Sequence, residues 1–157
     1  MKLLKRICIT CISCLFLTII FNCASNKYSL EDSVSFQFDR SYYQEWFAGI
    51  HVGGTGINLF FPNLNSANSV VIDSVYFRNL KGKLVKDRAS YVASLKNKSP
   101  YDTSKTVVDI PFKLLDNECV ISYYENGIKK YFKVSNIAEK EGIYYEDGPP
   151  EVITSYD

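Results

Sequence analysis

Apolar and polar residues alternate along most of the chain after residue 32. Val34, Phe36 and Phe38 alternate with polar neighbours, a period of two that is typical of strands with one buried face. Similar patterns, or an enrichment in β-branched and aromatic residues, mark further runs: "INLFFP", "SVVIDSVYFRN", "KLVKD" after a turn at Lys81-Gly82, "SYVASLK" and "KTVVDIPFKLL". No segment keeps the 3.6-residue period of a helix, and "NIAEKEG" supplies one helical turn at most. The pattern predicts a chain made of strands.

The clearest local signal is a hairpin within "ECVISYYENGIKKYFKVSNI". Two strand-like runs flank Asn126-Gly127, the pair that best tolerates positive φ at both central positions of a type I′ turn. In the first run Cys119, Ile121 and Tyr123 share one face. We therefore expect Cys119 to be a small buried residue and not a nucleophile.

The number and spacing of these runs indicate the fold class. About eight short strands, with turn signals roughly every 8–12 residues, favour an all-β antiparallel sandwich or a small barrel. An immunoglobulin-like sandwich is the preferred interpretation, with Trp46 as a candidate core tryptophan, although the cysteine pair of antibody domains is absent. We expect this domain to cover residues 33–143. Residues 144–157, with two prolines, are expected to be extended or partly disordered.

The N-terminus has the pattern of an export signal. A basic head precedes an uncharged, mostly apolar run from Ile7 to Phe21, which is shorter than the roughly 20 residues of a membrane-spanning helix and fits a signal core of roughly 7–15. The following "FNCAS" resembles a bacterial lipoprotein cleavage site and predicts lipidation of Cys23. We expect a signal peptide over residues 1–22 and a lipidated tether over 23–32. A plain signal peptide cut elsewhere and an uncleaved anchor are the alternatives.

Removal of the signal changes the charge of the chain. The full chain has 18 basic and 17 acidic residues, and three of the basic ones lie in the signal, which leaves 15 against 17. A slightly acidic domain lacks the basic footprint on which nucleic-acid binding depends. The clusters "LKGKLVKDR" and "GIKKYFK" alternate with apolar residues and are interpreted as solvated faces of strands or turns. We expect no nucleic-acid partner.

Motifs for catalysis or cofactor binding are incomplete. In the glycine-rich "WFAGIHVGGTGINLFFP", Thr55 stands where a Walker loop needs lysine, and Leu59 where a dinucleotide fingerprint needs glycine. A hairpin or bulged bend between two strands is the simpler interpretation. His51 is the only histidine, too few for a zinc site, and no G-x-S-x-G elbow accompanies it. We expect no metal, no cofactor and no enzyme, and leave open a hydrolase with an unrecognised site.

Aromatic residues make up 15% of the chain, several of them as doublets such as Tyr123-Tyr124. Neighbours on a strand face opposite sides, so each doublet is expected to place one ring inward and one outward. Outward rings stabilise a sheet as cross-strand pairs or bind sugars and protein partners. If a binding platform exists, we expect it to use Tyr43, Trp46 and Tyr124.

Three long stretches, "QEWFAGIHVGGTGINLFF", "IDSVYFRNLKGKL" and "PFKLLDNECVISYYENGIKKYFKVSNI", together with the "GPP" tail, resemble short lipoproteins of Bacteroidota of the flavobacterial type. This family carries no assigned activity, so the resemblance implies an envelope lipoprotein without functional residues. We expect a non-enzymatic β domain, held in the outer membrane by lipid on Cys23, that contacts another envelope protein. It faces either the periplasm or the cell surface. The alternative is a glycan- or peptide-binding module with exposed rings.

Overall fold

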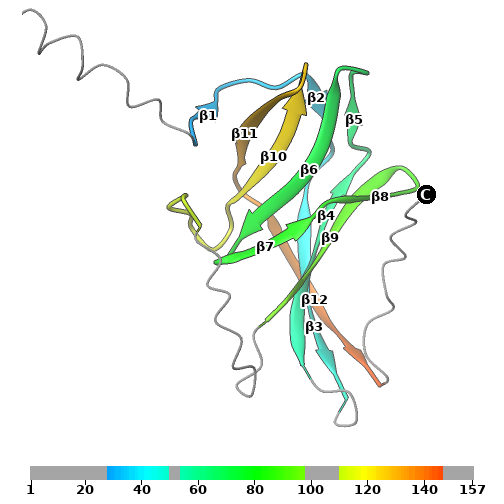
Figure 1. Cartoon of the computed structure of the whole chain (residues 1–157). Coiled ribbons are helices and arrows are strands. Elements are labelled where there is room, and N and C mark those ends of the chain that lie inside the picture. Colours follow the sequence, from blue (N-terminus) through cyan, green and yellow to red (C-terminus); the bar gives the residue numbers. More distant parts are fainter. Residues whose placement is uncertain (1–27, 50–53, 98–109, 147–157) are drawn as a thin grey trace, which may run out of the picture.

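The computed structural model describes residues 28–49, 54–97 and 110–146, and over these ranges the chain forms strands and no helix (Figure 1). Within the described ranges there is consequently no helix long and apolar enough to cross a membrane. The predicted signal peptide, Cys23 and His51 lie outside the described residues.

The strands form two five-stranded sheets and one short ladder. Sheet 1 has the order β1-β11-β10-β6-β7, and sheet 2 has the order β12-β3-β4-β9-β8. Sheet 1 consists of β1 (Leu30–Glu31), β11 (Ile128–Val134), β10 (Cys119–Glu125), β6 (Val70–Phe77) and β7 (Leu80–Lys83). Sheet 2 consists of β12 (Ala138–Tyr145), β3 (Tyr42–Ala48), β4 (Thr55–Pro62), β9 (Ser90–Lys96) and β8 (Val85–Asp87). The ladder pairs β2 (Phe36–Gln37) with β5 (Asn65–Ser66).

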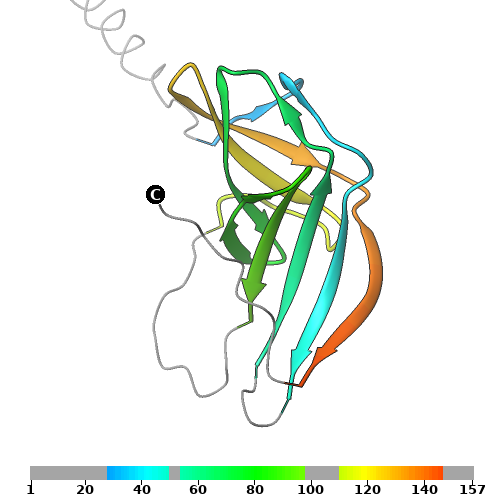
Figure 2. The same ribbon diagram turned by 90° about the vertical axis from the view of Figure 1, so that its right-hand side faces the viewer.

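The strand order is that of an immunoglobulin-like sandwich. The order β3-β4-β9-β8 follows the A-B-E-D sheet, and β11-β10-β6 follows the G-F-C sheet, to which β7 adds one strand. Neighbouring strands are antiparallel except for the parallel pairs β1–β11 and β12–β3. Figure 2 shows the two sheets as separate layers. The predicted all-β sandwich is confirmed, and in the described part of the chain the sheets do not close into a barrel.

The core lies between the sheets and is built from alternate residues of each strand. Inward-facing side chains of β4 and β10 are buried: Ile57, Leu59, Phe61, Cys119, Ile121 and Tyr123. Burial of each large apolar side chain stabilises the fold by about 1.5–3 kcal/mol. Phe36 brings the β2–β5 ladder into the same core, since its ring lies edge-on to Tyr123 with the centroids 5.1 Å apart.

The predicted hairpin between β10 and β11 is confirmed. Asn126 and Gly127 have φ angles of 51° and 78°, as a type I′ turn requires. The residues on either side of this turn, Glu125 and Ile128, are register partners.

The turn expected at Lys81-Gly82 was placed wrongly. The chain turns at Arg78-Asn79, where φ is 45° and 61°, and Lys81-Gly82 lies inside β7. A Cβ atom on Gly82 would lie 2.4 Å from a methyl carbon of Leu95 on β9. The glycine therefore allows the two sheets to approach closely and does not mark a turn.

The folded domain is longer at both ends than residues 33–143. Leu30 and Glu31, expected in the tether, pair with β11. At the other end β12 occupies most of "NIAEKEG", where at most one helical turn was predicted, and continues through Tyr145, inside the segment expected to be extended or partly disordered. Both added strands pair with partners about 100 residues away in the sequence, so local pattern does not reveal them.

The segment from Ile110 to Leu115, expected within a strand, forms none in the structure. It covers the outer face of sheet 1 instead, where Ile110, Phe112 and Leu114 pack against a small buried cluster. Pro111 removes one backbone donor, which disfavours a ladder position at this point.

Candidate functional site

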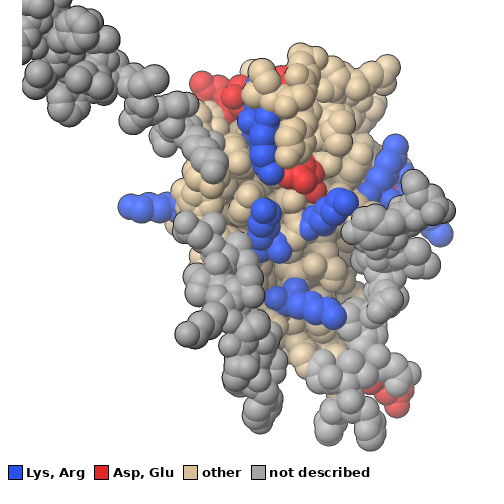
Figure 3. Space-filling view, viewed as in Figure 1, with Lys and Arg blue, Asp and Glu red and all other residues tan. Residues whose placement is uncertain are grey.

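Several lysines gather on the outer face of sheet 1. Val120 of β10 faces away from the core, and its register partners are Lys133 of β11 and Tyr76 of β6. The same register places four exposed lysines on this outer face: Lys81, Lys83, Lys129 and Lys133. We call this surface the lysine face. Figure 3 shows basic groups gathered on this side of the molecule.

One acid is built into the lysine face by a bulge. Ser122 pairs with Ser74 but Tyr123 pairs with Ile72, so Asp73 is an extra residue in β6. Its carboxylate accepts hydrogen bonds from Ser122 Oγ at 3.0 Å and Lys129 Nζ at 2.8 Å. Burial works against ionisation of Asp73, but these hydrogen bonds outweigh it and lower the pKa.

Among the described residues of the lysine face, basic side chains outnumber acidic ones. Lys129 pairs with Asp73, and Lys133 pairs with Glu118 at 2.9 Å. The hydrogen bond from Lys133, followed by the one from the Leu115 amide, lowers the pKa of Glu118. Lys81 lies over the ring of Tyr76, 5.3 Å from its centroid. In the described part of the chain this surface therefore holds four lysines and two acids.

The start of the described chain packs onto the same face. The ring of Tyr28 lies 5.5 Å from that of Tyr131 and 5.9 Å from that of Phe112, centroid to centroid. Phe112 also contacts Tyr76 at 5.2 Å and Tyr131 at 5.4 Å. We call these four rings the Tyr28 cluster. The cluster fixes the point where the chain enters the domain to the outer face of sheet 1.

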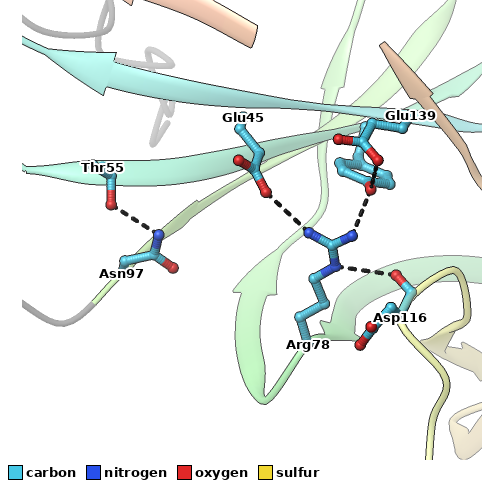
Figure 4. Close-up of polar contacts among 7 residues, drawn as sticks. Glu45, Thr55, Arg78, Asn97, Asp116 and Glu139 are labelled. Carbon is cyan, nitrogen blue, oxygen red and sulfur yellow. Dashed lines mark hydrogen bonds and ion pairs between the residues drawn. The ribbon is translucent and has the colours of Figure 1, made fainter. Parts of the chain in front are cut away.

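A second group of polar residues joins the two sheets at the β6–β7 turn (Figure 4). Arg78 donates from Nη1 to Glu45 of β3 at 3.0 Å and from Nε to the carbonyl of Asp116 at 3.1 Å. Its Nη2 donates to the hydroxyl of Tyr43, which donates in turn to Glu139 of β12 at 2.7 Å. We call this group the Arg78 network. Each nitrogen of Arg78 has an acceptor, so the network acts as a clamp between sheets.

The chemistry of the Arg78 network is structural. Burial, followed by the hydrogen bond to Glu139, raises the pKa of Tyr43, and the charge of Arg78 opposes them only in part. Tyr43 therefore stays protonated near neutral pH and is a poor nucleophile. The guanidinium carbon of Arg78 lies 4.5 Å from the centroid of the Tyr43 ring, which adds a cation–π contact to the clamp.

The predicted platform of Tyr43, Trp46 and Tyr124 does not form. Tyr43 and Trp46 are each only 2% exposed. Tyr43 points into the core, and the Trp46 ring lies over Gly56 on the opposite face of sheet 2. Tyr124, 37% exposed, belongs to sheet 1. The glycine-rich stretch misled the prediction, since Gly56 provides space for the indole and not for a ligand. Trp46 is buried, but it is not the core tryptophan of an immunoglobulin-like sandwich.

Three aromatic doublets place one ring inward and one outward, as predicted. The inward members Tyr43, Phe61 and Tyr123 are buried, and their neighbours Tyr42, Phe60 and Tyr124 are more exposed. Tyr42 and Phe60 are register partners, and their rings stack with the centroids 4.7 Å apart. These outward rings therefore form a cross-strand pair.

Cys119 and Ser35 lack the surroundings that would activate them as nucleophiles. Cys119 is fully buried, as expected, and burial raises the pKa of its thiol far above its ordinary value. Ser35 donates to Glu125 at 2.7 Å beside an open hollow of about 430 Å³. Hydrogen bonds from Lys130 and then Ser35 lower the pKa of Glu125, which makes this carboxylate a weak base. Among the described residues no His, Cys, Asp and Glu side chains gather in a group that could hold a metal ion.

The lysine face was missed because its parts lie far apart in the sequence. The spacing of Lys81 with Lys83 and of Lys129 with Lys133 indicates a shared side of each strand. Only the order β11-β10-β6-β7 shows that both pairs share one surface. Comparison with known proteins adds nothing to this geometry: no family model, curated protein or solved structure matches the chain.

Proposed function

We propose that the protein is a cell-envelope lipoprotein, anchored in the outer membrane through acyl chains on Cys23, whose β-sandwich acts in protein interaction and not as an enzyme. The basic head, the short apolar run and "FNCAS" support the anchor. A lipid on Cys23 would lie five residues before Tyr28, where the described domain begins.

The observation that carries the interaction is an exposed aromatic pair. Phe47 of β3 and Tyr144 of β12 are register partners and are 44% and 68% exposed. They lie near the ends of two strands, at the opposite end of the sandwich from β1 (Figures 1 and 2). An anchor that precedes β1 thus leaves this pair at the far end of the domain. Aromatic anchors of this kind dominate the binding energy of protein interfaces.

The competing functions have less support. Glycan capture depended on Tyr43 and Trp46, which are buried. A hydrolase needs a nucleophile beside a competent base, and in the described Ser35–Glu125 pair the lowered pKa makes the carboxylate a weak base. A second open hollow, of about 450 Å³, is bordered by Asp39, whose carboxylate accepts a hydrogen bond from Asn63 at 2.7 Å.

Site-specific photo-crosslinking in intact cells tests the interaction. A photoreactive phenylalanine analogue at Tyr144 should give a discrete adduct, and the same analogue at Ala89, an exposed turn residue, should not. Phe47→Ser in the Tyr144 variant should remove the adduct. Identical products at both positions, or none at Tyr144, would contradict the proposal.

Fractionation tests the anchor separately. Wild-type protein should be found with membranes, and mass spectrometry should show an acylated mature N-terminus at Cys23. The Cys23→Ala variant should move to the soluble fraction. If this variant stayed membrane-bound, the lipid assignment would be wrong.

A further inference from the structure

The lysine face and the point of attachment lie on the same surface. Tyr28 contacts Tyr131, which stands between Lys129 and Lys133 on β11. The chain therefore enters the domain from the outer face of sheet 1. Neither the sequence pattern nor the proposed protein contact accounts for this placement.

The length of the connecting chain limits how far the lysine face can be from the membrane. Cys23 and Tyr28 are five residues apart, and an extended chain spans at most about 3.3–3.6 Å per residue, or roughly 18 Å in all. An acylated Cys23 sits at the headgroup level of the bilayer. Tyr28 must then remain within that reach of the headgroups, and Tyr131 of the lysine face lies beside it.

The composition of the surface matches a layer of anionic headgroups. The described residues of the lysine face include four lysines and two acids, whereas the chain after residue 22 has more acids than bases. Two exposed apolar side chains share this surface: Val71, 62% exposed, and its register partner Tyr124. Lysine with scattered aromatic and aliphatic groups is the composition of a peripheral membrane contact.

We propose that the lysine face lies against the anionic headgroup surface of the membrane that holds Cys23. This inference rests on the proposed lipid anchor. It assigns sheet 1 to the membrane side and orients the sandwich with sheet 2 facing away. A single acyl chain binds a membrane only marginally, and a basic surface is a recognised second attachment.

Fluorescence quenching in proteoliposomes tests the orientation with the full, natively processed protein. Environment-sensitive fluorophores are attached to Val71→Cys on the lysine face and to Ser94→Cys, exposed on the outer face of sheet 2. Cys119 is fully buried and does not compete for the label. Vesicles contain phosphatidylethanolamine and phosphatidylglycerol, or phosphatidylcholine alone, each with a headgroup quencher.

On anionic vesicles we expect the probe at Val71 to be quenched several-fold more than the probe at Ser94. The difference should disappear on neutral vesicles and at high salt, because salt screens exposed charges. Lys81→Gln with Lys83→Gln should weaken attachment of the lysine face by roughly fivefold for each lysine removed, and the difference in quenching should fall with it. The matched control, Lys96→Gln with Lys140→Gln, removes two exposed lysines of sheet 2 and should leave the difference unchanged.

Two outcomes separate this inference from the anchor. Protein that floats with the vesicles but shows equal quenching at both positions would overturn the inference and leave the anchor intact. Protein that fails to float with either kind of vesicle would overturn the anchor, and the inference with it.

Discussion

The outer faces of the two sheets obey the same alternation rule but are completed in different ways. On sheet 2 the outward rings pack within their own sheet: Tyr42 stacks on Phe60, and Lys140 lies 3.5 Å from the centroid of Tyr42. On sheet 1 the outward rings Tyr76 and Tyr131 are covered by Tyr28 and Phe112, which come from distant segments. The packing on the outer face of sheet 2 therefore depends on sheet 2 alone. The packing on the outer face of sheet 1 also depends on the segments that cover it.

The largest expected effect comes from removing the centre of the Tyr28 cluster. Tyr131→Ala deletes a buried ring that contacts Tyr28, Tyr76 and Phe112, and we expect it to lower the free energy of unfolding by about 3–4 kcal/mol. Urea denaturation followed by far-ultraviolet circular dichroism measures this loss. Tyr131→Phe keeps the ring and serves as the control. A loss below about 1 kcal/mol for the alanine variant would show that the covering segments contribute little.

Sheet 2 is best tested at Gly56. A Cβ atom there would lie 2.2 Å from the Leu95 carbonyl oxygen and 2.5 Å from the Trp46 ring, so Gly56→Ala forces the backbone or the indole to shift. We expect a loss of about 1–3 kcal/mol and a change in tryptophan emission, since Trp46 is the only tryptophan.

Gly142→Ala is the control for that experiment, because its Cβ atom would meet nothing closer than 3.2 Å. It should cost less and leave the emission unchanged. Unchanged emission and stability in Gly56→Ala would contradict the close contact between β4, β9 and the indole.

The smallest expected effect concerns the charges of the lysine face. The folded-state pKa of Asp73 is lowered, so its contribution is present above the unfolded-state value of about 3.9 and is lost as the pH falls through the folded-state pKa. Asp73→Asn should reduce the decline in stability between about pH 5 and pH 3. The effect should be below about 1 kcal/mol, because the pair with Lys129 is partly solvated.

A double-mutant cycle identifies the partner in this effect. Lys129→Gln should weaken the acid dependence as Asp73→Asn does, and the two changes together should add little to either alone. Full additivity of the two variants would show that Asp73 and Lys129 do not interact.

The sequence predicts the features that depend on neighbouring residues. The Asn126-Gly127 hairpin, the inward position of Cys119 and the two-sided arrangement of three doublets follow from turn geometry and strand alternation, and these are confirmed. The platform around Tyr43 and Trp46 was wrong because exposure depends on which strand lies opposite. The lysine face and β12 require pairings between distant segments. A pattern of period two carries no information about such partners.

The two parallel pairings also have a consequence for folding. β1 pairs with β11, and β3 pairs with β12. Two strands near the start of the domain therefore each pair with a strand about 100 residues later in the sequence. Contacts of such long sequence separation slow folding, because loop closure precedes any stabilisation. A chain that becomes available for folding from its N-terminus onward cannot complete either sheet until β11 and β12 are present. Until then β3 lacks its second neighbouring strand and has an unpaired edge. Unpaired edges of this kind promote aggregation and are bound by chaperones.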